Sequence, residues 1–152
     1  MEKQIMEQVF AVAIGREVKA YEFYKKVAAK AVNEAVKKTF EELAGDELTH
    51  REKLETLLHD PTRIMKFNQP KADYKVAEAT PLPDPSIEMK PADAIVLAMK
   101  KEQEAVEFYR QLALDAADEG IKLMFDNLAN MELNHKIRLE NVYVEIGYPE
   151  VF

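Results

Sequence analysis

The chain of 152 residues carries one helical pattern twice, and this duplication constrains its fold more than any other feature. Residues 11–55 align with residues 96–140 without a gap, at a constant shift of 85 residues, and 18 of the 45 aligned positions are identical. Both copies have apolar residues at spacings of three and four, the period of an amphipathic helix. The duplication therefore predicts a fold made of two equivalent helical halves.

The prolines separate the two copies. Six of the seven occur between positions 61 and 91, and a proline inside a helix loses a hydrogen bond and clashes with the preceding turn. We therefore predict a proline-rich crossover at about residues 60–90, between one helical hairpin at about 2–59 and a second at about 91–146. Two hairpins joined in this way predict an all-α four-helix bundle with one long crossover, and residues 1–152 are expected to form a single domain.

The hairpins divide further at short polar connections. We predict four helices, at about residues 2–30, 34–59, 91–116 and 119–146. Asn33 and Asp118 are the expected N-caps of the second and fourth helices, Pro91 suits the first turn of the third, and Gly147 can end the fourth.

Composition excludes several classes of function. The formal net charge is -7 and lysines alternate with glutamates, so a nucleic-acid partner is not expected. The chain contains no cysteine, which excludes disulfides and cysteine-ligated metal sites within it. Neither a signal peptide nor an apolar run long enough to span a membrane is recognisable, so we expect a soluble, cytoplasmic protein with no membrane partner.

Polar residues interrupt the apolar stripes of the second and fourth helices at matching positions. The stripe of the second helix contains Val36, Phe40, Leu43, Glu47, His50, Leu54 and Leu57. The stripe of the fourth contains Ile121, Phe125, Leu128, Glu132, His135, Leu139 and Val142. Each therefore places a Glu-x-x-His pair on the face that packs into the bundle. One such pair would be weak support for a site, but two pairs at equivalent positions are specific.

The first and third helices each add one glutamate to this pattern. Glu17 lies among Ala13, Ile14, Ala20, Tyr21, Tyr24 and Val27, and Glu102 among Ala98, Met99, Ala105, Val106, Tyr109 and Leu112. Four buried carboxylates without opposite charge would cost several kcal/mol each. Two divalent cations would balance them, and carboxylate oxygens with imidazole nitrogens suit iron or manganese. The predicted metal ligands are Glu17, Glu47, His50, Glu102, Glu132 and His135.

Other candidates are less specific. Tyr24 and Tyr109 follow a predicted ligand by seven residues, and they are either core residues or hydrogen-bond donors to the ligand carboxylates. His59 is expected on the surface at the end of a helix. Glu22, Glu104 and Glu107 point away from the stripes and are not expected to bind metal.

With this paired pattern, the chain resembles the ferritin-like di-iron carboxylate superfamily, and within it the rubrerythrin-like proteins. The resemblance covers both hairpins and implies a ferritin-like four-helix bundle holding two iron ions, with Mn or Zn as alternatives. It implies terminal carboxylates at Glu17 and Glu102, bridging carboxylates at Glu47 and Glu132, and one metal for each of His50 and His135. Rubrerythrins usually have a further glutamate ligand where this chain has Ala105, and a rubredoxin domain with four cysteines, which this chain lacks.

The expected function is a di-iron oxidoreductase that reduces hydrogen peroxide or dioxygen, in the manner of rubrerythrins involved in oxidative stress. Because the chain has no cysteine, we expect electrons to come from an external donor protein, and we expect a homodimer. Two alternatives remain open at this point. One is a ferroxidase of an iron-storage cage, and the other is a non-catalytic bundle, with zinc or no metal, that acts as an interaction module through its GYPEVF tail.

Overall fold

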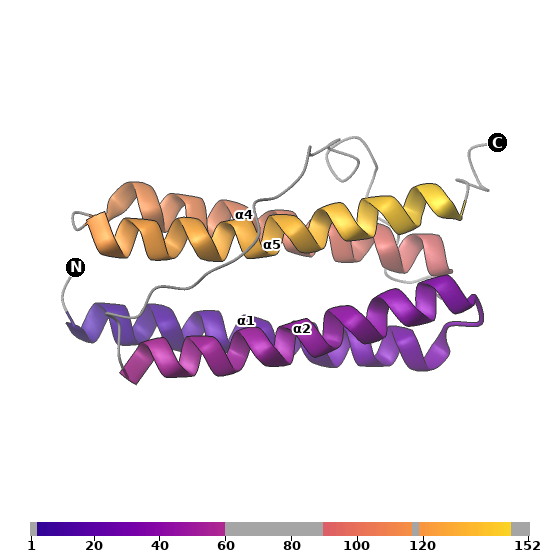
Figure 1. Cartoon of the computed structure of the whole chain (residues 1–152), viewed down its shortest axis with the longest axis horizontal. Helices are drawn as coiled ribbons and strands as arrows, with labels where there is room; N and C mark the ends of the chain where they lie inside the picture. The colour runs from indigo at the N-terminus through magenta and orange to yellow at the C-terminus, as the bar shows by residue number, and fades with distance from the viewer. Residues whose placement is uncertain (1–2, 60–89, 117–118, 147–152) are drawn as a thin grey trace. The chain divides into compact units, whose positions relative to one another are not determined.

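The computed structural model describes residues 3–59, 90–116 and 119–146, and within these ranges the chain forms four helices and no strand. They are α1 (Lys3–Lys30), α2 (Glu34–His59), α4 (Pro91–Asp115) and α5 (Glu119–Glu145) (Figure 1). Each predicted helix end is therefore confirmed to within one residue. The predicted crossover, apart from Lys90, and the predicted caps Asp118 and Gly147 lie outside the described residues.

The described residues divide into two compact units. The first comprises those of Met1–Lys66 and Asp115–Met124, and the second those of Phe67–Leu114 and Phe125–Phe152. The first unit contains the hairpin of α1 and α2, and the second contains most of the hairpin of α4 and α5. The expectation of a single domain over residues 1–152 stays a prediction.

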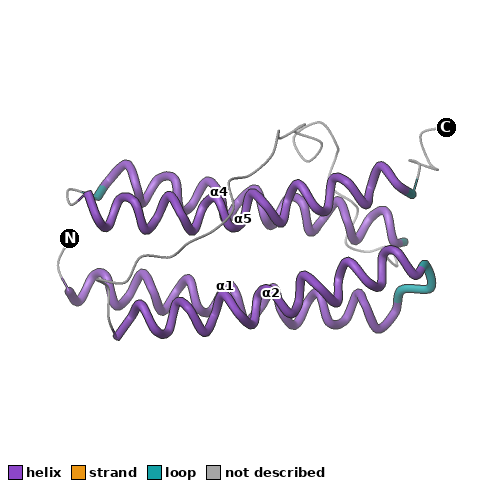
Figure 2. Tube along the Cα trace, viewed as in Figure 1, coloured by secondary structure: helices purple, strands orange, loops and turns teal. Residues whose placement is uncertain are grey.

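In the first hairpin, α1 and α2 run antiparallel, joined by the short loop at residues 31–33 (Figure 2). Asn33 caps α2, because its side-chain Oδ1 accepts a hydrogen bond of 3.1 Å from the backbone N–H of Val36. This is the N-cap that the sequence predicts. Near this end of the hairpin the rings of Tyr24 and Phe40 pack in a tilted arrangement, with centroids 5.5 Å apart.

In the second hairpin, polar side chains tie α4 to α5. Arg110 of α4 donates to Asp126 Oδ1 at 3.2 Å and to Asn130 Oδ1 at 2.7 Å, both on α5. Further along the pair, Lys136 Nζ donates to Gln103 Oε1 at 2.7 Å. As partner numbers rise on α5 they fall on α4, so these two helices are also antiparallel.

Burial confirms the predicted stripes. On α2 the buried positions are Val36, Phe40, Leu43, Ala44, Glu47, His50 and Leu54, and on α5 they include Phe125, Leu128, Glu132, His135, Leu139 and Val142. Ile121 is half-buried, and the side chain of Leu57 lies outside the description. None of the helices in the described part of the chain has a stretch long and apolar enough to cross a membrane.

Candidate metal centre

Six charged or titratable side chains that the sequence predicts as metal ligands are all buried. Their exposed fractions lie between 1% for Glu47 and 7% for His50. Burial of a carboxylate costs several kcal/mol unless a cation or hydrogen bonds compensate for the lost water. Four glutamates at these positions therefore require compensation within the protein.

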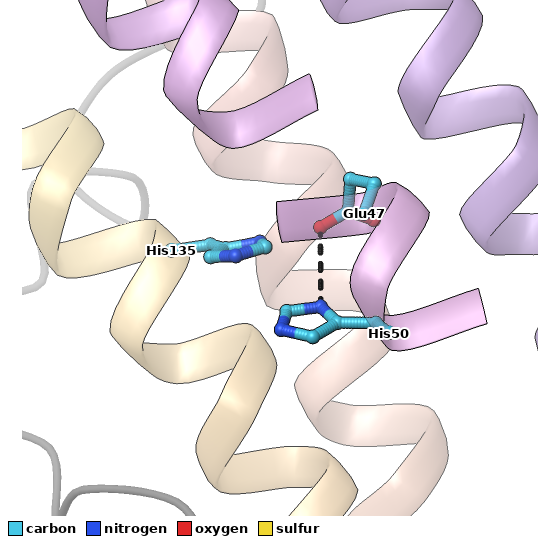
Figure 3. A group of neighbouring side chains, drawn as sticks. All are labelled: Glu47, His50 and His135. Carbon is cyan, nitrogen blue, oxygen red and sulfur yellow. Dashed lines mark ion pairs between the residues drawn. The ribbon is translucent and has the colours of Figure 1, made fainter. Parts of the chain in front are cut away.

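The first half-set of ligands consists of Glu17 on α1 with Glu47 and His50 on α2. His50 Nδ1 lies 3.6 Å from Glu47 Oε1 and 3.9 Å from Glu17 Oε2. Figure 3 shows His50 and Glu47 facing each other on α2, joined by a dashed line. One potential ligand atom from each of the three residues lies within 4.8 Å of the others, so the three side chains converge.

The second half-set repeats this arrangement with Glu102 on α4 and with Glu132 and His135 on α5. His135 Nδ1 lies 3.6 Å from Glu102 Oε1. One ligand atom from each of these three residues also lies within 4.8 Å of the others. The second hairpin therefore brings together the residues that correspond, at a shift of 85, to those of the first half-set.

Helix geometry explains why both half-sets form. Residues three apart in a helix are neighbours on one face, so each Glu-x-x-His pair projects two donors in the same direction. The antiparallel partner helix then supplies one glutamate at the same level. A helical hairpin with a glutamate on each arm can thus build a three-donor set without any contribution from a loop.

The donors fit a metal ion in chemistry and in spacing. Imidazole nitrogen and carboxylate oxygen together suit iron, manganese and zinc. Two donors that bind one ion at about 2.1 Å each lie at most about 4.2 Å apart. The separations of 3.6 Å and 3.9 Å within the half-sets fall inside this limit and exceed the length of a good hydrogen bond.

Of the other residues considered from the sequence, the two tyrosines are buried and the remaining ones are exposed. Tyr24 and Tyr109 are buried, and Tyr109 packs edge-on against Phe108, with ring centroids 5.2 Å apart. Hydrogen bonding of either tyrosine to a ligand carboxylate stays a prediction. His59 is exposed at the end of α2. The glutamates excluded from the stripes, Glu22, Glu104 and Glu107, are exposed as expected.

Sequence reasoning missed two buried charged residues on α5, Lys136 and Glu140. Lys136 is 0% exposed and Glu140 is 1% exposed, and neither lies on the apolar stripe that the sequence predicts. The alignment of the two copies contains a feature that indicates this burial. Asp46 and Glu52 of the first copy correspond to Met131 and Ile137 in the second, so charged positions of α2 become apolar on α5.

That exchange widens the apolar surface of α5 beyond the predicted stripe. Met131, Ile137 and Tyr143 are buried as well as the stripe itself. Lys136 lies between these positions on the helix and is buried with them. Glu140, which is also buried, is four residues further along α5, a spacing that puts two side chains on the same face of a helix.

Comparison with known proteins agrees with the fold. The chain matches the family model described as rubrerythrin over residues 8–143. It is 32% identical over 125 residues to the uncharacterized protein YhjR of Bacillus subtilis (strain 168), with 82% of this chain and 77% of that protein covered. A solved structure of a hypothetical protein from Pyrococcus furiosus is similar with a TM-score of 0.64 and 28% identity, over 91% of this chain and 88% of the other.

The structural likeness confirms the predicted fold class, an all-α ferritin-like four-helix bundle. The family model covers both hairpins and therefore both half-sets. With this match over most of its length, the chain belongs to the rubrerythrin family.

Proposed function

We propose that this chain is a di-iron oxidoreductase that reduces hydrogen peroxide or dioxygen with electrons from a separate donor protein. The observation that supports the proposal most is the pair of buried half-sets, each with two carboxylates and one imidazole. Membership of the rubrerythrin family supports the same reading.

In this proposal the six residues hold two metal ions between them. Four carboxylates carry a charge of -4, and two divalent cations balance it. Glu17 and Glu102 would be terminal ligands, Glu47 and Glu132 would be bridges, and His50 and His135 would each bind one ion. The same donors would accept manganese or zinc, so iron is part of the proposal and its identity needs measurement.

When bound, two ferrous ions supply the two electrons that, with two protons, reduce one hydrogen peroxide to two waters. The protein contributes the surroundings of that chemistry. Carboxylate ligands favour the more highly charged ferric state through their negative charge. In the first hairpin Phe40 and Leu43 are fully buried on the ligand face of α2, and Phe125 and Leu128 have the same position on α5. These apolar side chains exclude water beside each half-set.

Electrons must reach the site from outside these 152 residues in this proposal. The chain contains no cysteine, so it cannot hold the four-cysteine iron site that rubredoxin domains provide. A separate redox protein as donor, a homodimeric state and a cytoplasmic location complete the proposal.

A single-turnover experiment tests the function. Protein produced with ample iron is analysed for metal, reduced without oxygen and mixed with hydrogen peroxide or dioxygen. The proposal expects about two iron ions per chain and oxidation of two ferrous ions for each hydrogen peroxide consumed. Fewer than about one tightly bound transition metal per chain would contradict it.

Two comparisons make the result specific. Replacement of the proposed bridges, Glu47→Ala or Glu132→Ala, should abolish binding of two metals, while the exposed Glu22→Ala should not. Native mass then distinguishes the alternatives. An assembly of many subunits that accumulates iron would favour an iron-storage role, and a metal-free bundle of unchanged stability would favour an interaction module.

A further inference from the structure

The two hairpins carry the same ligands but differ in the residues beside them. At the shift of 85 residues, Lys136 and Gln103 of the second hairpin correspond to Arg51 and Val18 of the first. Lys136 directly follows the ligand His135, and Gln103 directly follows the ligand Glu102. These two positions therefore adjoin the half-set on both helices of the hairpin.

In the second hairpin the two residues form a tie between the helices, which we call the lysine tie. Lys136 Nζ donates to Gln103 Oε1 at 2.7 Å, and the lysine is fully buried. The amide of Gln103 is oriented from its other side as well, because its Nε2 donates to Glu107 Oε1 at 3.0 Å. A part-buried, charge-assisted hydrogen bond of this length restricts the movement of α4 against α5 at the level of Glu102 and His135.

The first hairpin has no equivalent of the lysine tie at these positions. The side chain of Arg51 is 46% exposed, and its Nε donates along its own helix to Glu55 at 2.8 Å. Val18 on α1 has no polar side-chain atom that could accept a hydrogen bond. The residues adjoining the first half-set therefore leave α1 and α2 without a hydrogen bond between them at positions 18 and 51.

A second polar connection between α4 and α5, about two turns along α4 from Gln103, is also not repeated at the corresponding positions of the first hairpin. Arg110 joins α4 to Asp126 and Asn130 of α5. The corresponding residues of the first hairpin are Lys25, Glu41 and Gly45, of which the first two have exposed side chains and the third has none. The second hairpin thus has two polar ties that are not repeated at the corresponding positions of the first.

On the basis of the proposed function, we propose that the two metal positions are unequal, and that the second hairpin holds the tighter one. Lys136 and Gln103 act as positioning residues for Glu102 and His135. Ligands that are already in place lose less freedom when a metal binds, so their affinity is higher. Partners of metal ligands typically change affinity by about 10- to 100-fold. We expect the first metal to bind at the second hairpin at least about tenfold more tightly than the other.

Charge does not favour the second hairpin, because Asp46 and Glu52 of the first correspond to the apolar Met131 and Ile137. Lys136 by itself would repel a cation bound at the second half-set, which would lower the affinity. Glu140 is buried four residues away on α5 and balances that charge. The first hairpin has the corresponding pair, Arg51 and Glu55, with the same signs. At positions 18 and 51 and their counterparts 103 and 136, the remaining difference is the hydrogen bond from Lys136 to Gln103.

The test is a titration of the metal-free, full-length protein with Co²⁺, followed by visible absorption, which reports the ligand geometry of each bound ion. Wild-type protein should bind two ions in two resolved steps with distinct spectra. His50→Ala should keep the tighter step and lose the weaker one. His135→Ala should lose the tighter step.

The lysine tie is tested with the ligands intact. In the Lys136→Met/Gln103→Leu/Glu140→Gln variant, both partners of the tie are replaced by apolar residues of similar size, and the buried Glu140 loses its charge together with Lys136, so no buried charge is left alone. The two affinities should then agree within about threefold, and the spectrum of the first equivalent should become a mixture. Arg51→Met is the matched control, because the residue is exposed in the other hairpin, and it should keep both steps. Gln103→Glu preserves the acceptor and should keep them too.

The outcomes separate this inference from the proposed function. Two ions bound with equal affinity by the wild type, or a tighter step that survives His135→Ala, would overturn the inequality and leave the metal centre in place. Failure of the wild type to bind Co²⁺ at all would overturn both. The histidine variants decide the order of binding by themselves, so the result does not depend on whether the triple variant folds.

Discussion

Replacement of Glu17 by glutamine should raise the stability of the metal-free protein and weaken metal binding at the same time. Glu17 is 2% exposed, and its carboxylate lies within 4.8 Å of a carboxylate oxygen of Glu47. Glutamine keeps the shape of the side chain and removes its charge. Stability of the metal-free protein should rise while metal affinity falls, and a purely structural role for Glu17 would not produce this combination.

The size of the effect follows from the distance. At the upper limit of 4.8 Å for this separation, two unit charges repel by about 3.5 kcal/mol at an effective dielectric constant of about 20. Relaxation of the side chains and uptake of protons relieve part of this repulsion. The metal-free variant should therefore be more stable than the wild type by about 1–3 kcal/mol. In the metal-loaded state, a tenfold weaker affinity removes about 1.4 kcal/mol of ligand stabilisation.

The assay is urea unfolding followed by circular dichroism at neutral pH, first with a chelator and then with excess Co²⁺. Glu22→Gln is the matched control, since Glu22 is exposed on the same helix, and it should change stability by less than about 0.5 kcal/mol in both conditions. The reasoning is refuted if metal-free Glu17→Gln is no more stable than the wild type, because the carboxylate would then be compensated without a metal.

Three further substitutions test the description of the first hairpin by urea unfolding. Gly45→Ala should stabilise the protein by about 0.5–1 kcal/mol. Gly45 is exposed within α2, and an added Cβ meets no atom within 4 Å. A loss of stability would mean that this surface is covered. Asn33→Ala should cost about 1 kcal/mol through loss of the cap on the Val36 N–H, whereas Asn33→Gly should cost less. Phe40→Ala should lower the free energy of unfolding by about 3–5 kcal/mol, because the ring is fully buried against Tyr24. A loss below about 1 kcal/mol would contradict its place in the core.

The sequence allowed the four helices and both half-sets to be predicted because the duplication supplies the signal twice. Glu47 and His50 alone could belong to a solvated helix face. Their repetition at Glu132 and His135, on stripes of the same period, indicates a shared packed face. Helical periodicity then predicts burial directly, and all four residues are buried.

The burial of Lys136 could not be predicted in the same way. A lysine one position away from a packed stripe is normally exposed, and its burial depends on what covers the neighbouring face of the helix. Periodicity describes one face of one helix and contains no information about a second covered face. The hydrogen bond from Lys136 to Gln103 likewise depends on the register of α5 against α4, which the spacing of residues within each helix does not determine.

Divergence between the two copies has affected the surroundings of the ligands more than the ligands themselves. Rubrerythrins usually have an additional glutamate ligand at the position of Ala105, which would make the two halves chemically different. Here Ala105 is 8% exposed on α4, and its counterpart at the shift of 85 residues, Ala20, is also alanine. Each half-set therefore contains two carboxylates and one imidazole of the same types. A difference in affinity between the two metal positions cannot arise from the identity of these ligands, so its measurement would report the effect of their surroundings, to which Lys136 and Gln103 belong.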